Sequence, residues 1–392
     1  MSALFRIWLL RGLAAAFETL APFVLFQRTA QAAHERLLRW LRFLDNAPLC
    51  VPIADALHRL TTYEYATDLG GARLSQRLML AAGLVKGDGF ANEDEALHAV
   101  SAGDNIMPGW RIVPALAGPV EFGSFTRHPR IGNTGTVVWR HESTRSTQNR
   151  VGLRSPGARA AARFLGLNRS KLPKEFGINI AASPGVANID EQTRDVVESL
   201  EFFLDAGVRP TWFTLNISCP NTEDDPQGYQ LEAETRQLCS AFIQSLRARE
   251  VEIPLWVKIS PGLAPEQYHT LMQVFSDVGV RAVVATNTLP KPSPDDDNVH
   301  AGLGGGELHP EALNSVRLLL AEKNRKRYAI DVIACGGIVD GASLREYKRL
   351  GVKAGQYWTA LVFRGPFAAA IIESELARHE RRLRAFHRES LA

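Results

Sequence analysis

Cysteine is scarce in this chain, and no two cysteines are spaced as a metal-binding or redox pair. Only Cys50, Cys219, Cys239 and Cys335 occur among 392 residues, with no C-x-x-C motif. This distribution argues against an iron–sulfur cluster, a zinc site or a disulfide framework, and it indicates a reducing compartment. Any electron carrier must therefore be an organic cofactor or a partner protein.

Two further signals are absent. The formal net charge is only +3 and no Lys/Arg cluster has interleaved aromatic residues, which gives little support to nucleic acid binding. No G-x-G-x-x-G turn follows the first strand-like run, as it often does in a dinucleotide-binding doubly wound sheet. With 45% apolar and 22% charged residues, the composition is that of a soluble globular protein, and we expect a small-molecule substrate.

Residues 4–26 form a strongly apolar stretch, but charges interrupt it at Arg6, Arg11 and Glu18. These charges leave no unbroken run of the roughly 18 apolar residues that a spanning helix needs, and Arg11 divides what could be a signal-peptide core. The sequence therefore predicts neither a membrane-spanning helix nor a cleaved signal.

A basic amphipathic helix is predicted directly after this stretch. Four leucines recur at helical spacing, at positions 37, 38, 41 and 44. Arginines at positions 36, 39 and 42 take the other side, with Trp40 and Phe43 near the boundary. We expect residues 1–70 to form a helical extension whose paired helices lie in the headgroup region of an anionic membrane. The alternative is a helical pair that packs on its own domain or on a second subunit.

From about Arg77 the chain alternates short apolar runs with longer helix-like segments, as a parallel sheet covered by helices does. Eight candidate strands occur, at residues 78–84, 120–125, 176–181, 212–218, 255–259, 282–286, 332–334 and 356–361. They predict an α/β fold in which residues 71–392 form a (β/α)8 TIM barrel. Residues 123–156 are polar with few helix signals, and we expect them to cross the barrel mouth.

Polar residues stand at the predicted strand ends, where barrels of this type build their sites. They are Lys86, Ser124, Asn179, Asn216, Cys219, Lys258 and the run Thr286-Asn287-Thr288. Asn216 and Asn221 flank Cys219, and two amides around a thiol that can take a proton suit redox chemistry on a pyrimidine-like ring. The competing interpretation of Cys219 is ordinary core packing. Lys258 lies in an apolar strand, so we expect it to need an anionic partner, which a reduced flavin supplies.

Two glycine groups flank the seventh predicted strand. Gly302-Leu-Gly304-Gly305-Gly306 precedes it, and Gly336-Gly337 closes it. Glycines let backbone N–H groups approach a phosphate, and the loops after strands seven and eight are the usual phosphate site of these barrels. A mononucleotide such as FMN therefore fits better than a dinucleotide. Plain turn geometry is the competing explanation of the glycines.

At this point the sequence resembles the FMN-dependent dihydroorotate dehydrogenases of pyrimidine (UMP) biosynthesis. The resemblance covers roughly residues 78–372 and rests on eight motifs in the family's order. These are Ala81-Ala-Gly-Leu-Val-Lys86, Asn149-Arg-Val-Gly152, Gly177-Ile-Asn-Ile180, Asn216-Ile-Ser-Cys-Pro-Asn-Thr222, Val257-Lys-Ile259, Ala285-Thr-Asn-Thr288, Gly336-Gly-Ile338 and Tyr357-Trp-Thr359.

The resemblance implies roles for individual residues. The substrate would be held by Lys86, Asn149, Arg150, Val151, Gly152, Leu153, Asn216, Asn221, Asn287 and Thr288. FMN would be held by Ala82, Gly83, Lys86, Ser124, Asn179, Asn216, Lys258, Thr286, Gly305, Gly337, Trp358 and Thr359. Cys219 would be the base that removes the C5 proton of dihydroorotate while hydride leaves C6 for the flavin. The resemblance implies no metal.

The sequence mixes features of the family's two classes. A helical N-terminal extension is typical of class 2, whose members pass electrons to quinone and associate peripherally with the cytoplasmic side of the inner membrane. Cysteine at the position of the base is instead typical of soluble class 1 enzymes, which use fumarate or NAD. We expect a class 2-like enzyme that uses quinone, and the alternative is a related enzyme whose acceptor is fumarate or a partner subunit.

Two loops depart from the class 2 pattern in their charge. Ala181-Ala-Ser183 stands where class 2 usually has Gly-Lys-Asn, and Glu223-Asp-Asp225 where it has Pro-Gly-Leu-Arg. Because these changes remove basic residues and add acidic ones, the substrate could instead be a related pyrimidine. A flavin-binding or pyrimidine-binding protein without catalysis is a third hypothesis.

Overall fold

Eight parallel strands close into a barrel, which confirms the predicted (β/α)8 architecture. The computed structural model describes residues 3–62, 65–186, 188–217 and 232–389. Around the barrel the strands follow the order β10-β13-β14-β3-β4-β7-β8-β9. Their bounds are β3 (Leu78–Leu80), β4 (Val120–Phe125), β7 (Phe176–Ala181), β8 (Trp212–Asn216), β9 (Leu255–Ile259), β10 (Ala282–Ala285), β13 (Asp331–Cys335) and β14 (Gly355–Tyr357).

Each of the eight predicted strand segments overlaps one barrel strand. Every residue of β4, β7, β8, β9 and β10 is buried, as expected for strands that are covered on both faces. The first and last strands are shorter than predicted. β3 ends at Leu80, and β14 ends at Tyr357 because Thr359 already begins a helix. The apolar run in the sequence continues from the strand into the buried turn that follows it, so the pattern alone does not mark where the strand ends.

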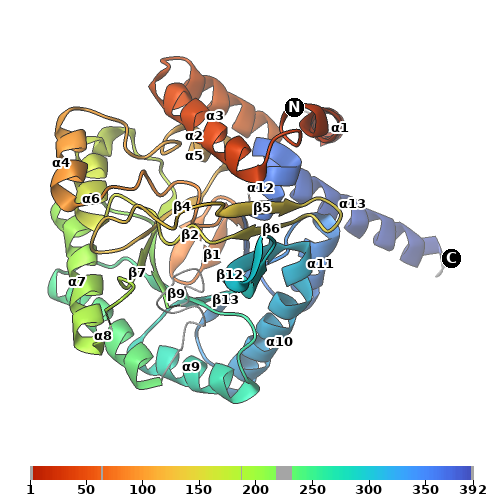
Figure 1. Cartoon of the computed structure of the whole chain (residues 1–392). Coiled ribbons are helices and arrows are strands. Elements are labelled where there is room, and N and C mark those ends of the chain that lie inside the picture. Colours follow the sequence, from red (N-terminus) through yellow and green to blue (C-terminus); the bar gives the residue numbers. More distant parts are fainter. Residues whose placement is uncertain (1–2, 63–64, 187, 218–231, 390–392) are drawn as a thin grey trace.

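Helices surround the barrel (Figure 1). Side-chain caps begin several of them: Asn92 accepts from the N–H of Glu95, Asn188 from that of Asp190, and Asp340 from those of Ala342 and Ser343. The helices are α4 (Glu93–Ser101), α5 (Ile112–Ala117), α6 (Ala158–Leu167), α7 (Ile189–Asp205), α8 (Glu232–Ala248), α9 (Pro265–Val278), α10 (His309–Lys326), α11 (Gly341–Arg349), α12 (Thr359–Arg364) and α13 (Ala368–Glu389), with 3-10 turns η1 (Arg169–Lys171), η2 (Gly306–Leu308) and η3 (Gly365–Phe367).

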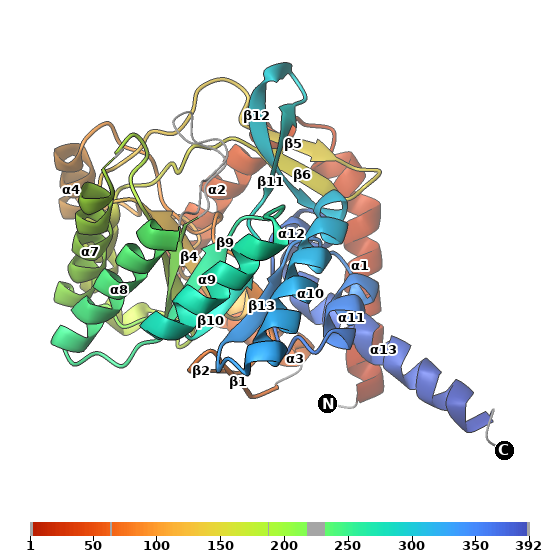
Figure 2. The same cartoon turned by 90° about the horizontal axis from the view of Figure 1, so that it is seen from below.

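A short hairpin packs at the end of the barrel where the strands begin. It consists of β1 (Thr67–Leu69) and β2 (Ala72–Leu74), and it lies at that end in Figure 2. Its Gly70 carbonyl accepts a hydrogen bond from Nε1 of Trp256 at 2.9 Å, and the indole of Trp256 stacks on Trp212 with 4.6 Å between ring centroids. Apolar packing therefore fills this end of the barrel, and the opposite end is left for a site.

A four-stranded antiparallel sheet covers part of the opposite end, the barrel mouth (Figure 2). Strands β5 (Val138–His141) and β6 (Ser146–Asn149) come from the polar excursion at residues 123–156, which confirms that this segment crosses the mouth. β6 pairs with β12 (Asp296–Gly305), which in turn pairs with β11 (Leu289–Ser293). The sheet thereby brings the glycine run at 302–306 beside Asn149.

Three helices precede the barrel and lie together at one side of it (Figure 1): α1 (Ala3–Val24), α2 (Ala30–Asn46) and α3 (Cys50–Thr61). By length and composition, residues Phe5–Val24 of α1 could cross a membrane, with a mean hydropathy of 1.4. The charges do interrupt the apolar run, as the sequence analysis states, but length and composition alone do not require an unbroken run. The charges are spaced widely enough that the 18 residues after Arg6 contain only Arg11 and Glu18. Glu18 also accepts a hydrogen bond from Arg364, a buried residue of α12.

Helix α2 is amphipathic, but its two sides differ from the prediction. Leu41 is buried and Leu38 and Leu44 pack against the core, whereas Leu37 is 39% exposed. Arg42, predicted on the side opposite the leucines, also reaches the barrel and binds Asp88 and the Asn105 carbonyl. Leu37 is therefore not part of the face of α2 that packs on the barrel.

Asp45 fixes the end of α2 to the barrel. Its buried carboxylate accepts hydrogen bonds from the backbone N–H groups of Gly109, Arg111 and Ile112 and from the Asn105 amide. Burial raises the pKa of Asp45, while these donors oppose the shift. The carboxylate satisfies N–H groups at the start of α5 that would otherwise lack partners.

Candidate active site

The polar strand ends converge on one cavity of about 180 Å³ at the barrel mouth. Nearly all residues that the sequence assigned to substrate and cofactor line it. They are Ala82, Gly83, Lys86, Ser124, Asn149, Val151, Gly152, Leu153, Asn179, Asn216, Lys258, Thr286, Asn287, Thr288, Gly305, Gly337, Trp358 and Thr359. Parallel strands meet at their carboxyl ends, so residues as distant in the chain as Ala82 and Thr359 come together.

Among the described residues, one assigned residue, Arg150, is not part of this lining. Arg150 follows Asn149, but its guanidinium donates to the Thr134 carbonyl at 3.0 Å in the loop outside the cavity. Cys219 and Asn221 lie outside the described residues, as does the acidic segment 223–225. Only Asn216 and Ile217 of the motif are described; Asn216 closes β8 and donates to the Ser124 hydroxyl at 3.4 Å.

A buried carboxylate that the sequence analysis missed lies inside the barrel. Glu121 of β4 has no exposed surface and accepts hydrogen bonds from Asn179 (2.8 Å), Trp212 (2.9 Å), Thr214 (2.6 Å) and Gln356 (3.0 Å). A signal was present in the sequence, because a carboxylate within an apolar strand is as costly to bury as Lys258 is. Gln356, which also lines the cavity, was missed in the same way.

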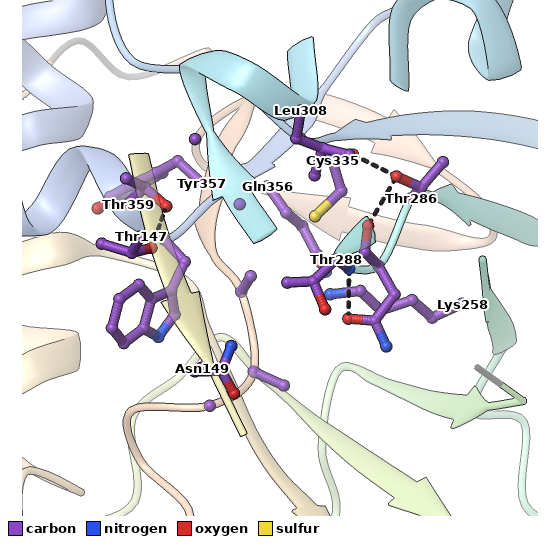
Figure 3. A pocket seen from close by; sticks show the side chains of 18 of the residues that line it. Thr147, Asn149, Lys258, Thr286, Thr288, Leu308, Cys335, Gln356, Tyr357 and Thr359 are labelled. Carbon is purple, nitrogen blue, oxygen red and sulfur yellow. Dashed lines mark hydrogen bonds between the residues drawn. The ribbon is translucent and has the colours of Figure 1, made fainter. Parts of the chain in front are cut away.

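Lys258 and Cys335 form one side of the cavity (Figure 3). Lys258 is 6% exposed and Cys335 is 8% exposed. Burial raises the pKa of the Cys335 thiol, whereas Lys258 lowers it by its charge and by a hydrogen bond. The thiol therefore stays protonated beside a buried cation. In the same region the Thr286 hydroxyl donates to the Asn287 carbonyl at 2.8 Å.

Several buried polar atoms that belong to cavity-lining residues have no hydrogen-bond partner among the described residues. They are Oδ1 of Asn179, Oε1 of Gln356, Oγ1 of Thr288 and Nε1 of Trp358. Buried polar atoms without partners are rare in folded proteins and are costly unless a ligand or water meets them. This set offers acceptors and donors to a polar ligand.

Two glycines shape the part of the cavity next to α10 and α12. A Cβ on Gly305 would lie 2.4 Å from the Arg145 carbonyl oxygen, and a Cβ on Gly337 would lie 2.3 Å from the Cβ of His309. Both have positive φ, +93° and +67°. Nearby, the hydroxyls of Thr147 and Thr359 share a hydrogen bond of 3.0 Å (Figure 3).

The N-terminal helices also contribute to the cavity. His34 of α2 and Val138 of β5 line it, although neither was predicted. Burial and the charges of Lys86 and Arg154 lower the pKa of His34 to about 4. His34 is therefore neutral at physiological pH, and the cavity extends from the strand ends to the surface of α2. Only the packing of α2 on the mouth could show this.

His34 is expected to make stability depend on pH. Its pKa in the folded state, about 4, lies below its ordinary value near 6.5, so the unfolded chain binds the proton more readily. The free energy of unfolding should therefore fall by up to about 3 kcal/mol as pH decreases from 6.5 to 4 and stay level above 6.5. Urea unfolding at several pH values should show a smaller decrease in His34→Gln. Parallel curves for the two proteins would contradict the assignment.

A closed (β/α)8 barrel whose polar side chains gather at the carboxyl ends of its strands has the architecture of a barrel enzyme. The sequence profile described as dihydroorotate dehydrogenase matches residues 111–379, more than half of the chain. The chain belongs to this family, and the resemblance seen in its motifs is confirmed.

Relatives with curated names point to one class within the family. A dihydroorotate dehydrogenase (quinone) from Sphingopyxis alaskensis is 30% identical, with 91% of each chain covered. One with the same name from Natronomonas pharaonis is 29% identical over 92% of this chain and 93% of its own. The solved structure of DHODH from Eimeria tenella in complex with ferulenol is 21% identical with a TM-score of 0.66, and covers 86% of this chain and 93% of its own. The last comparison supports the fold.

Proposed function

We propose that the protein oxidises dihydroorotate to orotate in pyrimidine biosynthesis, with FMN as cofactor and quinone as electron acceptor. The observation that carries this proposal is the convergence of three amides, Asn149, Asn216 and Asn287, with Lys86 in one cavity. Amides and an ammonium group suit a planar ring edged with carbonyl and N–H groups that also bears a carboxylate. The similarity to quinone-dependent relatives supports the choice of substrate.

FMN fits the remaining residues of the cavity. The unpartnered atoms of Asn179, Gln356 and Trp358 can meet the polar edge of an isoalloxazine, and Gly305 and Gly337 leave room for a phosphate. Lys258 lines the same cavity and would offer a cation to the negative charge that a reduced flavin gathers. When bound, FMN supplies a two-electron acceptor that can pass electrons on to a quinone.

Substrate binding, proton removal and access for the electron acceptor fall to residues of the chain itself. The substrate is bound and oriented by Asn149, Asn216, Asn287 and Thr288. The sheet of strands β11, β12, β6 and β5 keeps water from the ring. By its motif, Cys219 takes the C5 proton. His34 and Val138 line the side of the cavity that faces the N-terminal helices, which favours a quinone that approaches from that side over soluble fumarate.

The test is anaerobic mixing of the FMN-loaded protein with dihydroorotate, followed by addition of a short-chain quinone. Bleaching of the flavin and recovery of its absorbance are the expected results. Bleaching without recovery would indicate that the electron acceptor is fumarate or a partner subunit instead of a quinone. An FMN-loaded protein that dihydroorotate does not bleach would contradict the proposed substrate and favour a related pyrimidine.

We propose that the N-terminal helices attach the protein peripherally to the cytoplasmic side of the inner membrane. Twelve of the fifteen large apolar side chains that are exposed in the described part of the chain lie within residues 5–60: Phe5, Trp8, Leu20, Phe23, Val24, Leu37, Trp40, Phe43, Leu49, Ile53, Leu57 and Leu60. An exposed apolar surface of this kind, with arginines nearby, suits the headgroup region of anionic lipids.

Charges placed in this surface are expected to release the protein from membranes. The double substitution Trp8→Glu and Phe23→Glu changes side chains that are 70% and 73% exposed, and we expect at least about tenfold weaker binding to anionic vesicles. The matched control is Leu167→Glu on α6, 69% exposed, which should bind as the unaltered protein does. Equal binding by all three proteins in a flotation assay would refute the attachment.

A further inference from the structure

The hydrogen bonds of Glu121 link four strands within the barrel. Its carboxylate on β4 accepts from the Asn179 amide on β7, from Trp212 and Thr214 on β8, and from the Gln356 amide on β14. All five residues have no exposed surface. Two of the four donors, Asn179 and Gln356, also line the cavity, whereas Trp212 and Thr214 do not.

A carboxylate that only accepts hydrogen bonds determines how the two amides are turned. An amide has an NH2 group on one side and an oxygen on the other, so the nitrogen must face Glu121. The oxygens of Asn179 and Gln356 are then directed away from the carboxylate. Both oxygens are buried, and neither has a partner among the described residues. Glu121 thus fixes the orientation of two amides that could otherwise present either group, so that their oxygens act as acceptors.

We propose that Glu121 is a positioning residue that orients Asn179 and Gln356 as hydrogen-bond acceptors for the donor groups of the flavin. The inference rests on FMN being the cofactor. The donors of FMN are the imide N–H of its ring and the hydroxyls of its ribityl chain. β14 leads directly into Trp358 and Thr359 at the expected phosphate end, so Gln356 faces the ribityl hydroxyls. Asn179 lies on β7, which is three strands from β14 in the barrel, so it would accept from the imide N–H at the other end of the flavin.

Compensation of the charge on Lys258 is the competing explanation of a buried Glu121. The two roles predict different ligand preferences. Loss of a compensating charge would weaken the binding of all flavins alike. Loss of the amide orientation would weaken the binding of only those flavins that carry an imide N–H. An FMN analogue with a C–H in place of that N–H, 3-deaza-FMN, keeps the shape of the ring and removes the donor.

The experiment compares the binding of FMN and 3-deaza-FMN to apoprotein by fluorescence titration. We expect the unaltered protein to prefer FMN at least about tenfold, since a buried acceptor would be left unpaired by the analogue. In Glu121→Gln the new NH2 group must face an acceptor, so one amide turns its oxygen inward, and the preference should fall below about twofold. The control is Thr214→Val, which removes a donor to Glu121 that does not line the cavity and should keep the preference.

The outcomes separate this inference from the proposed function. If the unaltered apoprotein binds neither flavin, the proposed cofactor is wrong. If it binds FMN but does not distinguish the analogue, or if Glu121→Gln keeps the full preference, only the role of Glu121 is overturned. Circular dichroism of the apoprotein checks folding. If Glu121→Gln does not fold, Glu121→Asp takes its place, because its shorter reach should reduce the preference at least about threefold; an unchanged preference would overturn the inference.

Discussion

Replacing Cys219 by alanine is expected to slow the reduction of flavin by dihydroorotate by about 10²- to 10⁴-fold, the usual contribution of a positioned general base. The physical reason is that Cys219 stands at the position that the family uses for proton removal, and an alanine there has no group that can accept the proton. Stopped-flow absorbance under anaerobic conditions measures the rate. FMN content should stay the same, because Cys219 is not among the residues assigned to the cofactor.

The variant Cys219→Ser serves as the comparison. Serine is the residue of the quinone-dependent class, and a thiol has a reference pKa near 8.5, well below that of a serine hydroxyl. We therefore expect Cys219→Ser to retain the reaction but to need a higher pH for its maximum. A pH profile identical to that of the unaltered protein, or an alanine variant with full rate, would show that Cys219 is not the base.

The substitution Gly305→Ala is expected to destabilise the protein and weaken its binding of FMN at least about tenfold. The added Cβ would lie 2.4 Å from the Arg145 carbonyl oxygen and 2.8 Å from Cγ2 of Thr359, and backbone cannot move aside as a flexible side chain can. The positive φ of +93° adds about 1–3 kcal/mol of strain for any L-residue. Urea unfolding and flavin titration measure the two effects.

Gly351 provides a matched control for this substitution. Its φ is +97°, close to that of Gly305, but a Cβ there would meet nothing within 4 Å. Gly351→Ala should therefore show the backbone strain alone, with FMN binding unchanged. If the two alanine variants lose the same stability and bind FMN equally, the close approach of Gly305 to the loop at Arg145 has no role in the site.

The barrel was predictable because its signals are local. Each strand is an apolar run of a few residues followed by a polar residue, and this pattern survives in the sequence whatever the neighbouring elements do. The same holds for Lys258, whose position inside an apolar strand marked it as functional. Strand ends were predicted less well, since Leu84 and Leu361 continue the apolar runs beyond the last ladder hydrogen bonds of β3 and β14.

The sequence was least informative where the partner of a side chain lies far away along the chain. Arg42 was placed on the side of its helix opposite the leucines, and the sequence could not show that it pairs with Asp88 from the loop before α4. Leu37 was grouped with Leu38, Leu41 and Leu44 on one side of the helix, but it is exposed whereas Leu41 is buried. In α1 the charges at Arg11 and Glu18 interrupt the apolar run, and the sequence could not show that Glu18 has a partner in Arg364. Helical periodicity gives the angle between side chains, and the surface that each side meets depends on the fold.

The sequence by itself determined the class of fold, the family and more than half of the residues that line the cavity, because a parallel barrel places every strand end at one mouth. Only the tertiary structure decided that His34 reaches this cavity from α2, that Arg150 is directed away from it, and that Glu121 receives donors from three other strands. The physical reason is that strand ends follow from local order along the chain. The direction in which an amide or an imidazole turns depends on partners that folding brings from 58 to 235 positions away.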